Sequence, residues 1–300
     1  MASSSKSTKL YHTRSISLPC RSHPTTLRID EELNKLKTWE ASSTPTADTI
    51  CDGLSGLQEL YNCLDGLYNL PVTQQALSHH QHEKWINELL DGSLRLLDIC
   101  GVTRDVMSQM KEHIRDVQSA MRRRKGDSSI ESSIAKYTCF RKKMKKDAKK
   151  LIAALKQVDN KIEASPSPLL ESDHHITSLI RVLREVNVMS ISVFHTLLLF
   201  LSLPISKPMP TRRWSLVSNL LLKGAVGSEG QQENVNELGS VDIALHILSR
   251  CGMTEGDKMQ SAQNSFEALE VTIEVLENGS GSLFRRLIKA RASLLNIVSH

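Results

Sequence analysis

Apolar residues recur at intervals of three or four along most of the chain, which is the repeat of a helix packing along another helix. The clearest case runs from Ile130 to Ile162, where the positions step alternately by four and three residues. Its members are Ile130, Ile134, Tyr137, Arg141, Met144, Ala148, Leu151, Leu155, Val158 and Ile162. This seam predicts a long helix with one buried side.

The same spacing predicts helices before this segment. A short first helix is expected from Ile29, and Asp48 is expected to cap a second one. A long helical pattern follows from Lys84 to Met121. Because only a short turn at Gly126 separates it from the Ile130 helix, we expect the two to form an antiparallel hairpin.

A further seam occupies the C-terminal part, from Ala262 to Ile297, and Gly279–Gly281 lies in its middle. This arrangement is compatible with two helices or with one kinked helix. Apolar residues make up 40% of the chain and aromatic residues only 4%, which suits helices packed by aliphatic side chains. No strand pattern is evident.

The predicted fold class is therefore all-α, an elongated bundle of long antiparallel helices with coiled-coil-like packing. Residues 1–28 are rich in Ser and Thr and carry no acidic residue, which predicts a disordered basic tail. Residues 29–300 are expected to form a single helical-bundle domain. A hinge is predicted near residues 164–168, and an exposed loop near residues 224–240.

The most apolar stretch runs from Val188 to Leu203 and contains no charged residue. As a helix it measures about 24 Å, short of the roughly 30 Å hydrocarbon core of a bilayer. We interpret it as a helix buried on all sides within the bundle, and a membrane span or hairpin is the alternative. In the buried helix, His195 is expected to be a hydrogen-bonded core residue rather than a catalytic one.

The net charge of +5 is unevenly distributed. Between Arg122 and Lys161 there are fourteen Lys or Arg residues against four Asp or Glu residues. Seven cations are expected on the outer face of the Ile130 helix: Arg141, Lys142, Lys143, Lys145, Lys146, Lys149 and Lys150. This face is either simply solvated or a binding surface for an acidic membrane or an acidic protein. Nucleic acid is the least favoured partner, since no aromatic residues alternate with the lysines.

The basic tail contains a candidate phosphorylation site at Ser17. Arg14, three residues earlier, suits a basophilic kinase, and Pro19 follows two residues later. A phosphate on Ser17 would fit the Arg cluster of a phosphopeptide adaptor. The alternatives for the tail are a plain disordered segment and an organelle transit peptide.

No motif predicts catalysis, a metal or a cofactor. The six cysteines are scattered without a CxxC pair, which indicates reduced thiols. His79, His80 and His82 are interpreted as part of a solvated helix start rather than as ligands. Since no secretory signal is evident, we expect an intracellular and most simply a cytoplasmic protein, with a peripheral membrane or organelle location as the alternative.

Three stretches resemble a known family. They are Tyr11–Pro19 with His23-Pro24, Glu88–Gly101, and Leu283–Lys289 with Arg291–Asn296. Their order and spacing resemble the plant-specific BYPASS-related family, a domain of unknown function abundant in Arabidopsis, over nearly the whole chain. The resemblance implies a helical plant protein linked to root and shoot development, and it implies no catalytic residues.

The leading prediction is a non-enzymatic helical scaffold that binds other proteins through its helical surfaces and that self-associates where its seams are exposed. One rival is a membrane-associated protein that uses residues 188–203 and the Lys-rich face. The other is an enzyme of an unrecognised type, which would use His195.

Overall fold

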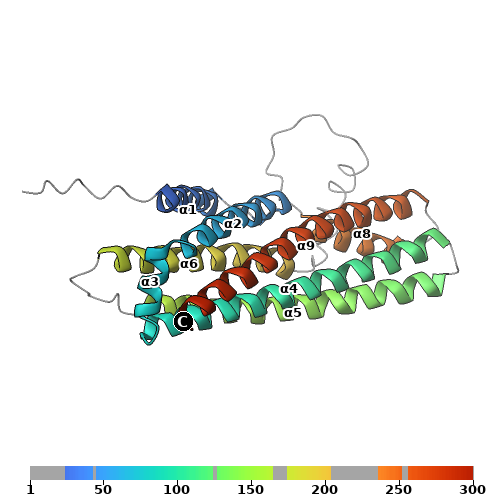
Figure 1. Ribbon diagram of the computed structural model, residues 1–300. Helices are drawn as coiled ribbons and strands as arrows, with labels where there is room; N and C mark the ends of the chain where they lie inside the picture. Colours follow the sequence, from blue (N-terminus) through green and yellow to red (C-terminus); the bar gives the residue numbers. More distant parts are fainter. Residues whose placement is uncertain are drawn as a thin grey trace, which may run out of the picture.

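The computed structural model describes residues 24–42, 45–123, 127–164, 174–203, 236–251 and 256–299. Within these ranges all the regular structure is α-helical, which confirms the all-α class. The helices are α1 (Pro24–Ser42), α2 (Ala47–Tyr68), α3 (Pro71–His79), α4 (Lys84–Arg123), α5 (Asp127–Ala164), α6 (His174–Ser202), α8 (Glu237–Cys251) and α9 (Gly256–Val298). Figure 1 shows the long helices lying side by side.

The α9 helix lies at the centre of the packing and contacts α2, α4 and α8. It runs antiparallel to α4, because Arg115 near the end of α4 pairs with Glu270 at 2.7 Å and Ser93 near its start accepts a hydrogen bond from Arg291 at 2.7 Å. It runs parallel to α2, since Lys289 near the end of α9 pairs with Asp65 near the end of α2 at 2.9 Å. The bundle therefore contains parallel as well as antiparallel neighbours.

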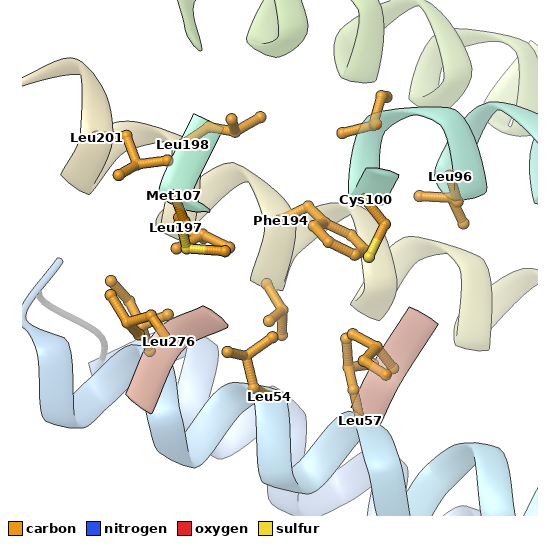
Figure 2. Close-up of a cluster of buried hydrophobic side chains, with 14 of the residues drawn as sticks. Leu54, Leu57, Leu96, Cys100, Met107, Phe194, Leu197, Leu198, Leu201 and Leu276 are labelled. Atoms are coloured by element: carbon orange, nitrogen blue, oxygen red, sulfur yellow. The ribbon is translucent and has the colours of Figure 1, made fainter. Parts of the chain in front are cut away.

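Side chains from four helices meet in the core. Figure 2 shows leucines of α2, Met107 and Cys100 of α4, Phe194 of α6 and Leu276 of α9 pointing toward one another. These side chains are almost completely excluded from solvent. Because each buried aliphatic side chain contributes about 1.5–3 kcal/mol, this shared interior is the main source of stability.

The predicted seams lie on the buried sides of their helices. All the described members of the Ile130 seam are buried except Ile134 and Leu151, which are partly buried. In the C-terminal seam only Ile297 is partly buried. α9 is one continuous helix through Gly279–Gly281. A Cβ on Gly279 would lie 3.2 Å from Leu54, so a small residue at this position allows α2 to approach closely.

Three predicted boundaries are wrong. α1 begins at Pro24 rather than at Ile29, so residues 24–28 of the predicted tail are helical. Proline suits a first helical position because its missing N–H needs no partner there. α2 is capped by Thr46, whose side chain accepts the N–H of Thr49, and not by Asp48. α8 begins at Glu237, inside the predicted loop, because the Asn236 side chain accepts the Gly239 N–H at 2.9 Å.

The rest of the tail (1–23), the hinge residues 165–168 and residues 224–235 of the loop lie outside the described part. Ala164 is the last residue of α5.

The prediction for residues 188–203 is right for most side chains and wrong for one narrow stripe. Phe194, Leu197 and Leu198 are buried. By contrast, Leu199 is 38% exposed and His195 is half-buried. These two lie four residues apart and therefore share the outer side of α6. His175–Ser202 is long and apolar enough to cross a membrane, but 67% of its most apolar window is already buried within the bundle.

Candidate interaction faces of the α4–α5 hairpin

The lysines predicted as a binding face lie on α5, beside α4 at the edge of the bundle (Figure 1). Five of them are exposed, namely Lys142, Lys143, Lys146, Lys149 and Lys150, and we call these five the basic face. They recur every three or four residues, which keeps them on one side of the helix. Lys145 is only half-exposed and lies at the border of this face.

The basic face is poorly neutralised. Among the described residues, the one ion pair it makes is that of Lys150 with Asp147 at 3.2 Å, within the same helix. An exposed pair of this kind contributes less than about 1 kcal/mol. Four ammonium groups are therefore left to attract an external negative charge.

Arg141 does not belong to this face, and its assignment to the outer surface is wrong. Its side chain is fully buried and donates hydrogen bonds to the carbonyl oxygens of Leu201 at 3.0 Å and Leu203 at 3.2 Å. These carbonyls are at the C-terminal end of α6, where the helix supplies no N–H groups of its own. Arg141 therefore ties α5 to the end of α6.

Asp242 of α8 is the counter-charge of this buried arginine, with 3.7 Å between its Oδ2 and the Nη2 of Arg141. Burial raises the pKa of Asp242 to about 6, even though Arg141 and Lys145 favour its charged form. Tyr137, one turn earlier on α5, is completely buried with its ring 5.3 Å from that of Phe266. Burial also raises the pKa of Tyr137. Because this cluster is almost completely excluded from solvent, its role is to join helices.

α4 carries a second charged row that the sequence analysis did not identify. Asp91, Asp98, Asp105 and Glu112 are spaced by seven residues and all are exposed, and we call these four the acidic row. Seven residues make about two helical turns, so the four carboxylates share one side of α4. The seven-residue interval between these acids is a signal in the sequence that predicts such a row.

The other candidate residues do not converge on a reactive site. His195 lies on the outer stripe of α6, and burial together with the nearby charge of Lys156 lowers its pKa. His80 closes α3, with its Nδ1 atom 2.8 Å from the Ala76 carbonyl oxygen. In the described ranges, no three side chains of metal-binding type gather in one place. Ser17, Arg14 and Pro19 lie outside the described residues.

A cavity lies where α2, α4, α6 and α9 meet, with Tyr68, Asn187 and Arg291 among its lining residues. Its volume is about 30 Å³, roughly the share of one water molecule in the liquid. Pockets for small organic ligands hold about 300–1,000 Å³. The cavity therefore has room for solvent and not for an organic substrate, and His195 does not line it.

Four cysteines are free thiols, namely Cys51, Cys63, Cys100 and Cys139. Cys63 and Cys100 are buried, whereas Cys139 is exposed and lies on the side of α5 that carries the basic face. Burial raises the pKa of Cys100 to about 12, so this thiol is protonated at neutral pH.

Comparison with known proteins gives one match. The family model described as Protein BPS1 matches residues 53–297, which span α2 from its seventh residue to nearly the end of α9. No curated protein matches the chain, and no solved structure matches it either.

Proposed function

The chain belongs to the BPS1 family, and from this premise we propose that it is a non-enzymatic helical interaction protein acting in the root and shoot development of plants. Its bundle is the scaffold, and the basic face of α5 binds an acidic surface on another macromolecule. The proposal rests on one observation: the exposed lysines of α5 have a single carboxylate, that of Asp147, as their neutralising partner in the described structure.

The position of the basic face supports this role. α5 packs against α4 on one side and α6 on the other, while a buried seam anchors it to the core. The lysines therefore project from a rigid support, so that little backbone ordering is required on binding. From Lys142 to Lys150 they extend along about 12 Å of helix, at 1.5 Å per residue.

Proximity labelling in root tissue tests the proposal. The test variant replaces Lys142, Lys143, Lys146, Lys149 and Lys150 by Gln. We expect it to fold normally but to lose the acidic neighbours that the wild type labels. The matched control removes five exposed cations elsewhere, with Lys35, Lys84, Arg123, Arg285 and Lys289 replaced by Gln. An unchanged set of neighbours in the test variant contradicts the proposal.

A membrane-associated protein is the second candidate, because α6 has the length and composition of a membrane-spanning helix. Insertion of α6 would pull Phe194, Leu197 and Leu198 out of the core, where all three are buried. We therefore expect alkaline carbonate to release the protein from a plant membrane fraction. Its retention in the pellet would favour the membrane-spanning alternative.

A further inference from the structure

Asp105 and Glu112 of the acidic row of α4 lie at the level of the basic face of the neighbouring helix α5. The rings of His113 on α4 and Phe140 on α5 are 4.6 Å apart, which fixes the register of the hairpin. α4 ends at Arg123 and α5 begins at Asp127, so the two helices run in opposite directions across a three-residue link (Figure 1). A residue of α4 that lies a given number of positions before His113 is therefore level with the residue of α5 that lies the same number of positions after Phe140.

This register matches carboxylates with lysines. Asp105 lies eight residues before His113 and is level with Ala148. Lys150 follows Ala148 by two residues, which is about 3 Å along the helix. Glu112 lies one residue before His113 and is level with Arg141. Lys143 follows Arg141 by two residues, which is again about 3 Å along the helix. Asp105 and Glu112 nevertheless form no ion pair with the lysines of the basic face within the described part of the chain. Packed helix axes lie about 8–10 Å apart, and both rows point outward.

A surface with this arrangement is complementary to itself. A two-fold axis parallel to the helices, midway between α4 and α5, places α4 of one copy over α5 of the other. Because the axis preserves level, Glu112 then meets Lys143 of the second copy and Asp105 meets its Lys150. Each contact occurs twice, as a closed two-fold interface requires.

Apolar exposure lies on the same surface. Val102 and Leu94 of α4 are each 44% exposed. Val102 precedes His113 by eleven residues, or three turns, and therefore points to the α5 side of α4. The two-fold axis runs along that side, so Val102 of one copy would lie against Val102 of the other. This contact supplies apolar burial that charge pairs alone do not.

We infer that the outer face of the α4–α5 hairpin is a homodimer interface, in which Asp105 and Glu112 of each copy bind the basic face of the other. The inference rests on the proposed function and specifies it, because the acidic surface that the lysines bind becomes α4 of a second copy. A membrane of acidic lipid fits less well, since it would repel the carboxylates of Asp105 and Glu112 next to the lysines it attracts.

Sedimentation velocity of the full chain tests the interface. We expect a dimer whose dissociation constant rises at least about tenfold between 0.05 and 0.5 M NaCl, because salt shortens the range of the charge interactions. One variant reverses α4 with Asp105→Lys and Glu112→Lys. The other reverses α5 with Lys143→Glu and Lys150→Glu. Each variant alone should be monomeric, because like charges then face each other.

Mixing the two reversed variants supplies the decisive result. In a mixed dimer every facing pair has opposite charges again, so an equimolar mixture should form heterodimers while each variant alone does not. The control, Asp52→Lys with Glu267→Lys, makes the same charge change as the α4 variant on exposed positions of α2 and α9. It should dimerise like the wild type, and all variants should retain the wild-type circular dichroism.

Three results overturn the inference. They are a wild type that stays monomeric at low salt, a dimer that survives either reversal, and a mixture that forms no heterodimer. Binding of a monomeric wild type to vesicles of phosphatidylserine would assign the lysines to lipid instead. A wild type that is monomeric, but whose basic face still determines which acidic neighbours are labelled in roots, would overturn the inference and leave the proposed function standing. Loss of the dimer is therefore distinguishable from failure of the proposed function.

Discussion

Replacing Arg141 with Met distinguishes a buried connection between helices from a surface charge. Methionine fills a similar volume but cannot donate to the carbonyl oxygens of Leu201 and Leu203, which accept hydrogen bonds at 3.0 and 3.2 Å. It also leaves Asp242 in the interior without its counter-charge. Breaking a buried charge pair costs about 3–5 kcal/mol. We expect a loss of that size in the free energy of unfolding at pH 8.

The cost should depend on pH in a defined direction. Removing Arg141 takes away a charge that favours the ionised form of Asp242, so the pKa of this carboxyl rises further above its value of about 6. At pH 5 the carboxyl is neutral in both proteins, and Arg141→Met should cost less there than at pH 8. Urea unfolding followed by circular dichroism at the two pH values measures the difference.

The adjacent Lys142 provides the control because it is exposed. Lys142→Met should change the free energy of unfolding by less than about 0.5 kcal/mol. The double variant Arg141→Met with Asp242→Leu should recover part of the loss, since apolar residues can replace a buried pair. If Arg141→Met were as harmless as Lys142→Met, the buried position assigned to Arg141 would be refuted.

Three other substitutions or reactions are informative. Gly53→Ala should destabilise the protein by about 1–3 kcal/mol in urea unfolding, because the added Cβ would lie 2.6 Å from the Trp39 ring. Asp242→Asn should abolish a pH dependence of the wild type, whose stability falls by up to about 3 kcal/mol as pH rises from the ordinary carboxyl pKa of 3.8 through the native pKa of about 6. A thiol reagent should modify Cys139 rapidly and Cys100 only on unfolding, since Cys139 is exposed and burial raises the pKa of Cys100 to about 12.

Controls accompany these predictions. At Gly66 the nearest atom to an added Cβ is 3.6 Å away, so Gly66→Ala should be neutral or stabilising by up to about 1 kcal/mol. The thiol experiment uses a Cys20→Ser, Cys251→Ser background. A Gly53→Ala protein as stable as the wild type, a pH profile unchanged in Asp242→Asn, or equal labelling rates for the two thiols would each contradict the corresponding argument.

The helices were predictable from sequence because their signal is local. An apolar side chain every three or four residues marks the buried side whatever the partner is, and the seams of α5 and α9 lie on that side. The boundaries of α1, α2 and α8 were less accessible. A cap such as Thr46 or Asn236 competes with equally polar neighbours within two or three residues, and tertiary contacts decide between them.

Arg141 shows why the site could be predicted only in part. Its position in the seam indicated burial, whereas its charge and its lysine neighbours indicated the surface. Arg141 is buried because the end of α6 supplies two carbonyl acceptors for its side chain and α8 supplies the counter-charge of Asp242. Those partners lie 60 to 101 residues away along the chain, so no local sequence pattern predicts them. The acidic row likewise becomes part of a candidate interface only in the folded protein, where α4 lies beside α5.

Rescue of plants that lack this gene product tests the central claim most directly. The claim is that the exposed lysines of α5 carry the function, so the variant with all five residues of the basic face replaced by Gln should accumulate as a folded helical protein yet fail to restore normal roots and shoots. The control that removes five cations elsewhere should restore them. Full rescue by the basic-face variant would contradict the account.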